Sequence, residues 1–133
     1  MEAKLGKAER KAFRIANLLD DAADAIRKRS RRAYREGRMS LEEYMEARAR
    51  ELELRAEVSV VVASDLSGVL EETPSAGENI EQAIRDAKGQ IETVRSVAKG
   101  LEIVALLVSL ASAIAAGEVR LVMGTSKALG ERV

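Results

Sequence analysis

The 133-residue chain contains neither cysteine nor histidine. Without cysteine it has no disulfide, no thiol nucleophile and no thiolate ligand for a metal. Without histidine it lacks the commonest general base and the commonest metal-binding side chain. Carboxylates remain, but the dinuclear metal sites of helical bundles use Glu-x-x-His pairs. We therefore expect no enzymatic activity, no cofactor and no metal site.

Proline and aromatic residues are also scarce. The sequence has one proline, Pro74, and three aromatic residues, Phe13, Tyr34 and Tyr44. With so few helix breakers, long helices are favoured, and a core without large rings must be built from Leu, Ile, Val and Ala. The length suits one domain over 1–133. These features predict an all-α fold class with closely packed helices.

Apolar residues recur at steps of three and four, which is typical of amphipathic helices in a bundle. Gly37 marks the end of the first helix, and Ser40 with Glu43 forms a capping box for the second. Pro74 ends the second helix, because the residue before a proline avoids helical angles. The predicted antiparallel bundle comprises a helix over 3–36, a helix over 41–72, a loop over 73–79, a helix over 80–116 and a tail over 118–133. The tail is predicted as either a short helix folding back or an extended segment.

The same spacing predicts which face of the second and third helices is buried. In the second helix, the predicted core row is Met45, Ala49, Leu52, Ala56, Ser59, Ala63, Leu66 and Leu70. In the third helix, the predicted row is Ile80, Ile84, Ala87, Ile91, Val94, Ala98, Leu101, Ala105 and Val108.

The formal net charge is zero, but the two signs are separated along the chain. Residues 1–40 hold twelve Lys or Arg against six Asp or Glu, a net of +6, and residues 41–74 hold three against nine, a net of −6. In a hairpin the basic end of the first helix lies beside the glutamate-rich start of the second, so we expect charge pairing there. The alternative is contact with an anionic membrane or with nucleic acid, which we disfavour because opposite charge lies at the matching place on the second helix. Nucleic acid is further disfavoured because only Tyr34 is near to stack on a base. The residues concerned are Arg27, Lys28, Arg31, Arg32, Arg35 and Arg38.

The stretch from Ile103 to Ala116 carries no charge and is apolar on every face. Its 14 residues rise about 21 Å, less than the roughly 30 Å of a bilayer core, which argues against a membrane span. A row of Ala, Ser and Gly along it favours the close approach of another helix. The stretch is therefore expected either to be a core helix within the chain, covered by the first two helices or by the tail, or to form an interface with another chain. The predicted interface comprises Ala105, Leu106, Ser109, Leu110, Ala113, Ile114 and Gly117.

These patterns predict a non-enzymatic protein–protein interaction or assembly module that works by docking one helix face on another. We expect a homo-oligomer, with a dimer favoured, or a complex with another helical protein. A membrane-associated protein using 103–116 and a nucleic-acid-associated protein using 27–38 are the alternatives. The N-terminus lacks the apolar segment of a signal peptide, and together with the absence of cysteine this favours the cytoplasm. No motif in the sequence identifies a family.

Overall fold

The computed structural model describes residues 7–63 and 76–132, and the fold is discussed for these residues only. Within them all regular secondary structure is helical, which confirms the predicted all-α class. The five helices of this part of the chain are α1 (Lys7–Arg35), α2 (Leu41–Ala63), α4 (Ala76–Thr93), α5 (Val97–Ala116) and α6 (Val119–Arg132).

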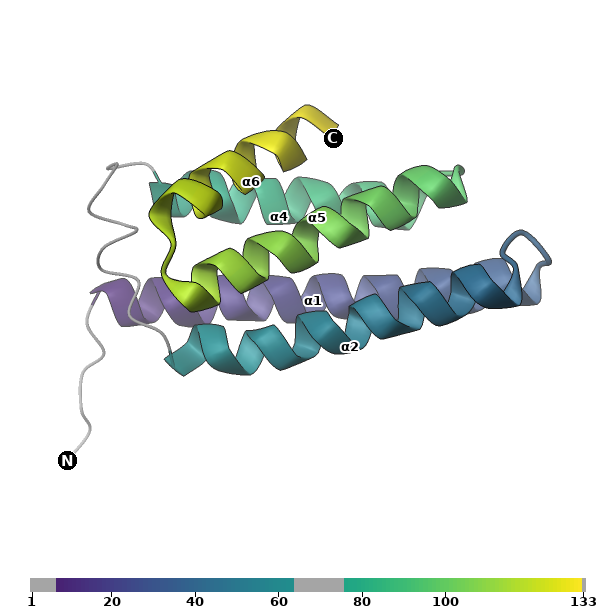
Figure 1. Ribbon diagram of the computed structural model, residues 1–133, viewed down its shortest axis with the longest axis horizontal. Coiled ribbons are helices and arrows are strands. Elements are labelled where there is room, and N and C mark those ends of the chain that lie inside the picture. The colour runs from purple at the N-terminus through teal and green to yellow at the C-terminus, as the bar shows by residue number, and fades with distance from the viewer. Residues whose placement is uncertain (1–6, 64–75, 133) are drawn as a thin grey trace.

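The helices form two hairpins, with α6 laid over the second (Figure 1). The first hairpin is α1 and α2, and the second is α4 and α5. Helix α1 packs against α2 and α4, α2 packs against α5, and α6 packs against both α5 and α4. Of the two predicted states of the tail, a helix that folds back is the one found.

The core lies between the two hairpins and under α6. It holds Ile15 and Leu19 of α1, with no exposed surface, together with equally buried leucine, isoleucine and valine side chains of the other helices. Burial of each such side chain contributes roughly 1.5–3 kcal/mol relative to exposure. Apolar burial is therefore the main force holding the hairpins together. The fully buried large residues of the second hairpin and α6 include Ile80, Ile84, Ile103, Leu107, Leu110, Ile114 and Leu129.

The predicted continuous helix over 80–116 is wrong, because the chain leaves the helical conformation at 94–96. Ser96 has extended backbone angles, and its hydroxyl accepts from the Lys99 amide at 3.2 Å, which makes it the N-cap of α5. On the other side of the break, the Arg29 guanidinium donates to the Val94 carbonyl at 2.9 Å. A side chain thus forms a hydrogen bond with a backbone group on each side of the break, the Lys99 amide and the Val94 carbonyl. The chain reverses direction between α4 and α5.

Two predicted boundaries also change. Helix α4 begins at Ala76, so the second half of the loop expected over 73–79 is helical. The expected extension of the second helix over 64–72 lies outside the described residues. The β-branched run over 58–62, which also suits a strand, is part of α2.

Gly117 ends α5 in the left-handed conformation, with φ of 70°. Its amide donates to the Ile114 carbonyl, and the Glu118 amide donates to the Ala113 carbonyl. Such a cap favours glycine, because a side chain at this φ costs roughly 1–2 kcal/mol. Gly117 is therefore required by the backbone turn.

This requirement gives a paired prediction. Gly117→Ala is expected to lower the free energy of unfolding by about 1 kcal/mol, since the new methyl meets open space and only the backbone is strained. Gly124→Ala, inside α6 with equally open surroundings, is expected to raise it by about 0.5–1 kcal/mol. Urea unfolding followed by circular dichroism measures both. Equal effects of the two substitutions would contradict the capping role.

Candidate association surface

Helix α2 presents apolar residues on two opposite faces. The inner face packs on α1 and α5 and buries Ala47, Leu54 and Val61, which are at most 2% exposed. The fourth buried residue of this face is a glutamate, Glu51, at 1% exposure. These four positions are separated by four, three and seven residues, so they follow one side of the helix.

The opposite face is exposed and nearly free of charge. Its three large side chains, Leu41, Met45 and Leu52, are 58%, 62% and 53% exposed. The smaller residues between them and beyond them are exposed too. We call this row the outer stripe of α2; it comprises Leu41, Met45, Ala49, Leu52, Ala56, Ser59 and Ala63.

The prediction of which face of α2 is buried is therefore wrong: the buried face is on the opposite side of the helix. Six of the eight residues predicted for its core, Met45 to Ala63, form the outer stripe, and the other two, Leu66 and Leu70, lie outside the described residues. Both faces show the same three–four spacing, and the outer one is the more apolar. Helix α2 can turn the less apolar face inward because the carboxylate of Glu51 is paired with arginines.

Glu51 is neutralised by two arginines one helical turn away on either side. Arg48 donates to one carboxylate oxygen at 3.0 Å, and Arg55 donates to the other at 2.9 Å. A buried carboxylate without such partners is strongly destabilising, so this arrangement makes the inner face tolerable. It also leaves the outer stripe without a cover from the described part of the chain.

Arg55 also ties α2 to α1. Its other nitrogens donate to Asp20 at 3.1 Å and to Asp24 at 2.8 Å, both on α1. The hydrogen bond from Arg55 lowers the pKa of Asp24, and the one to Asp24 raises the pKa of Arg55. One guanidinium thus joins three carboxylates and fixes the rotation of α2 against α1.

The structure separates the interface residues predicted on α5. Leu110 and Ile114 have no exposed surface and Ala113 has 5%, so these three belong to the core of the chain itself. Ala105 and Leu106 are half-buried, while Ser109 and Gly117 are exposed. The small residues border a hollow of about 460 Å³ between α2, α5 and α6, lined by Arg50, Glu53, Val108, Ser109, Ser112, Ala113, Ala116, Glu118, Leu121 and Thr125.

The charge pairing predicted along the first hairpin is absent from the described part of the chain. Of the six basic residues, Arg38 pairs with Glu36 of its own turn at 2.9 Å, and this pair lowers the pKa of Glu36. Among the described residues, none of the other five has a carboxylate within 4.0 Å. Lys28, Arg31, Arg32 and Arg35 form an exposed row, called here the basic row, because they point away from the buried side of α1. With Ala25, Arg29 and Glu92 they line a shallow hollow of about 440 Å³.

The absence of partners predicts that the basic row contributes little to stability. Reversal of two charges, Arg31→Glu with Arg35→Glu, is expected to lower the free energy of unfolding by about 1 kcal/mol at most, mainly because Arg35 lies in the last turn of α1, where the helix dipole favours a cation. The neutral pair Arg31→Gln with Arg35→Gln is the control for lost side-chain packing. Urea unfolding at low salt measures both variants, and a loss several times larger would show that these arginines pair in solution.

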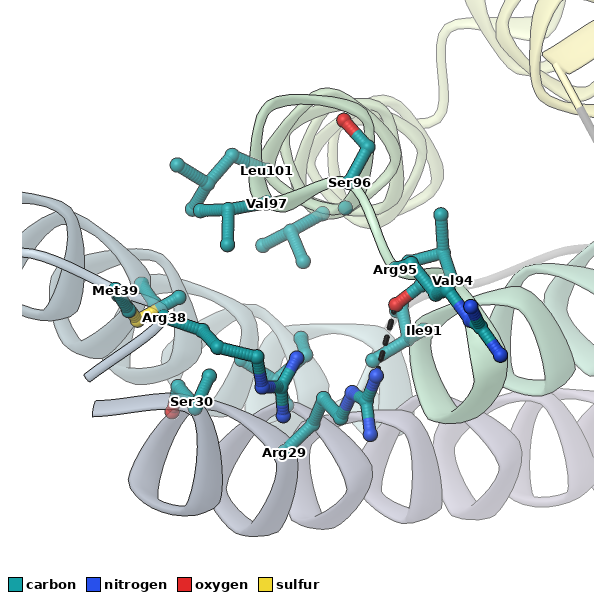
Figure 2. A pocket seen from close by; sticks show the side chains of 15 residues that line it. Arg29, Ser30, Arg38, Met39, Ile91, Val94, Arg95, Ser96, Val97 and Leu101 are labelled. Carbon is teal, nitrogen blue, oxygen red and sulfur yellow. Dashed lines mark hydrogen bonds between the residues drawn. The ribbon is translucent and has the colours of Figure 1, made fainter. Parts of the chain in front are cut away.

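A small cavity of about 50 Å³ lies where α1 meets the turn between α4 and α5. Figure 2 shows Arg29 reaching across it to the Val94 carbonyl, with Met39, Val97 and Leu101 around it. Small-molecule pockets measure roughly 300–1,000 Å³. This cavity is therefore smaller than a typical small-molecule pocket.

The described residues contain no group of three or more Asp and Glu placed to hold a metal ion. The other buried carboxylate, Glu81 of α4, lies beside Lys11 at 3.2 Å and Arg14 at 3.5 Å of α1. It serves as a charge contact between α1 and α4, whereas both arginine partners of Glu51 lie on α2 itself.

Helix α5 is the one described helix that is long and apolar enough to cross a membrane. Eight of its side chains are buried within the chain. A core helix of a soluble protein has the same length and composition, so this property alone is weak evidence for insertion.

The chain was also compared with known proteins. It matches no protein-family model, no curated protein and no solved structure.

Proposed function

We propose that the chain is a non-enzymatic assembly module that associates with a second copy of itself through the outer stripe of α2. The observation that carries this proposal is the exposure of Leu41, Met45 and Leu52 on one line of one helix. Contiguous exposed apolar surface of this kind marks association sites, whereas scattered apolar residues do not.

The spacing of the stripe suits another helix as its partner. From Met45 to Ala63 the steps are four, three, four, three and four, and every position is apolar or small. Two helices with this repeat bury their rows against each other as a short coiled coil. Helix-face docking is thus the mechanism we propose, although the face differs from the one predicted on α5.

Sedimentation velocity over low to high micromolar concentration tests this function. We expect a reversible equilibrium between monomer and dimer in the absence of detergent. A single species of 14.4 kDa at every concentration would overturn the proposal.

An anionic partner for the basic row is a second candidate function. It is favoured by the lack of any carboxylate within 4.0 Å of Lys28, Arg31, Arg32 and Arg35 among the described residues. Titration with duplex DNA and with vesicles containing phosphatidylserine, at several salt concentrations, tests it. Binding that falls with salt and is lost in the Arg31→Glu, Arg35→Glu variant supports this candidate; equal binding by both proteins contradicts it.

A further inference from the structure

We propose that the second copy docks parallel to the first and in register, and that charges beside the outer stripe select this orientation. This inference rests on the proposed function. The apolar row alone does not distinguish parallel from antiparallel docking, since helices in either direction bury it. The residues along its two edges do distinguish them.

One edge of the stripe is basic and the other is acidic. Arg48 and Arg55 each precede one of the alanines in the row, whereas Glu46 and Glu53 each follow Met45 or Leu52. At 100° per residue, these four side chains flank the stripe on opposite sides. In coiled coils, residues at these flanking positions set the direction of the partner helix.

Parallel docking brings opposite charges together. The basic edge of each copy then faces the acidic edge of the other, and Arg48 lies beside the partner's Glu53 five positions further on. The contact occurs twice because of the two-fold symmetry. Each side chain is already paired within α2, Arg48 with Glu51 and Glu53 with Arg50. Their exposure of 46% and 51% leaves further donor and acceptor atoms for the contact with the second copy.

Antiparallel docking brings like charges together. In that direction each edge faces the same edge of the other copy. When the whole row from Met45 to Ala63 is buried, Glu53 meets the partner's Glu53 and Arg55 meets the partner's Arg55. The other two charged residues face the valines that complete each edge, Val60 and Val62. Like charges at such positions disfavour the pairing. The electrostatic pattern therefore favours the parallel dimer over the antiparallel register that buries the whole stripe.

The layers of the stripe are compatible with a parallel pair. Each residue meets its own equivalent, so layers of Ala49, Ala56 and Ala63 alternate with layers of Met45, Leu52 and Ser59. The alanines allow the two helices to approach closely. Glu42 is the one charged residue in line with the stripe, and it lies in the first turn, where the helix dipole favours a carboxylate.

Disulfide cross-linking tests the orientation, because the chain has no cysteine of its own. Ala49→Cys and Ser59→Cys are both at exposed positions of the stripe. In a parallel dimer, each variant links to itself in a glutathione redox buffer. When the two variants are mixed, no link forms between them, since ten residues separate the two positions by about 15 Å and a disulfide spans roughly 7 Å at most.

Three other outcomes each have a definite meaning. A link between the Ala49→Cys and Ser59→Cys variants in the mixture overturns the parallel orientation but leaves self-association through the stripe standing. Linking of Ser112→Cys, on the exposed small face of α5, without linking at either α2 position overturns both proposals. A monomer at every concentration, with no link in any variant, also overturns both.

Glu53→Arg gives a second readout of the same orientation. In the parallel dimer it sets two arginines against each other and is expected to raise the dissociation constant about 10-fold. In an antiparallel dimer, the introduced arginine meets either its own equivalent or the partner's Glu46. The first case exchanges one like-charge pair for another and the second creates an opposite-charge pair, so affinity is unchanged or higher. Sedimentation velocity measures the difference, and unchanged or tighter association would overturn the parallel arrangement.

Discussion

Replacing Arg55 with alanine is expected to lower the free energy of unfolding by about 2–3 kcal/mol. The substitution leaves the carboxylate of Glu51, at 1% exposure, with Arg48 as its remaining partner within 4.0 Å among the described residues. It also removes the contacts to Asp20 and Asp24 on α1. Loss of one partner of a buried charge is costly because the remaining charge stays desolvated.

Arg50 provides the matched control for this prediction. It pairs with Glu53 at 3.3 Å, and the two side chains are 38% and 51% exposed. An exposed pair of this kind contributes little, so Arg50→Ala is expected to change stability by less than about 0.5 kcal/mol. Urea unfolding at low protein concentration, where the monomer dominates, measures both variants. Equal losses would show that Glu51 is solvated in solution.

Glu51→Leu completes the comparison. It removes the buried charge itself, while Arg55 keeps Asp20 and Asp24 as partners. Replacing a buried ionic group with an apolar residue of similar size is often neutral or stabilising. We therefore expect a loss of less than about 0.5 kcal/mol or a gain, in contrast to the loss for Arg55→Ala.

Replacing Leu52 with glutamate is expected to weaken self-association by about 100-fold or more. In the proposed dimer the two copies of Leu52 share one layer. Since Leu52 is 53% exposed in the monomer, association buries about half of each side chain and each contributes roughly 0.8–1.5 kcal/mol. Loss of both, at the upper value, corresponds to about 100-fold in the dissociation constant. The two new carboxylates in the same layer repel each other and add to the effect.

The monomer is expected to tolerate Leu52→Glu, since the side chain is 53% exposed and glutamate favours helices. Leu121 of α6 is 52% exposed and lies on another helix, so Leu121→Glu is the matched control. Sedimentation velocity measures association, and circular dichroism verifies the fold. Equal weakening by the two substitutions would place the contact elsewhere.

The all-α fold class and the start of α2 were both predictable from the sequence. The Ser40–Glu43 capping box forms in both directions, with hydrogen bonds of 2.9 and 3.1 Å. Helix α1 buries Ile15, Leu19 and Ile26, which lie four and seven residues apart, the same spacing that predicts the other helices. These features are local or depend on one row of apolar residues, so spacing alone identifies them.

Other features depend on partners that no spacing reveals. The inner face of α2 includes Glu51, which is paired with Arg48 and Arg55. Arg55 is in turn held by two aspartates of α1. Because the inner row is interrupted by Glu51, a search for uninterrupted apolar rows selects the outer stripe instead. The break before Ser96 was missed for a related reason, since the apolar row continues through it while the N-cap depends on one hydroxyl.

The basic row illustrates the limit of charge counting. Opposite net charges on neighbouring helices do predict attraction between them. They do not determine which residues face each other, and the contact between α1 and α2 uses Asp20 and Asp24 with Arg55 instead. In this contact α1 supplies the acidic residues and α2 the basic one, whereas the prediction had basic residues on α1 and acidic residues on α2.

The stacked tyrosines give the first hairpin an optical signal of its own. Tyr34 of α1 and Tyr44 of α2 lie with ring centroids 4.8 Å apart and planes inclined by 18°. The chain has no tryptophan and no other tyrosine, so its near-ultraviolet circular dichroism arises mainly from this pair. Far-ultraviolet dichroism reports all helices together. A loss of the first signal before the second would show that the first hairpin opens before the helices melt.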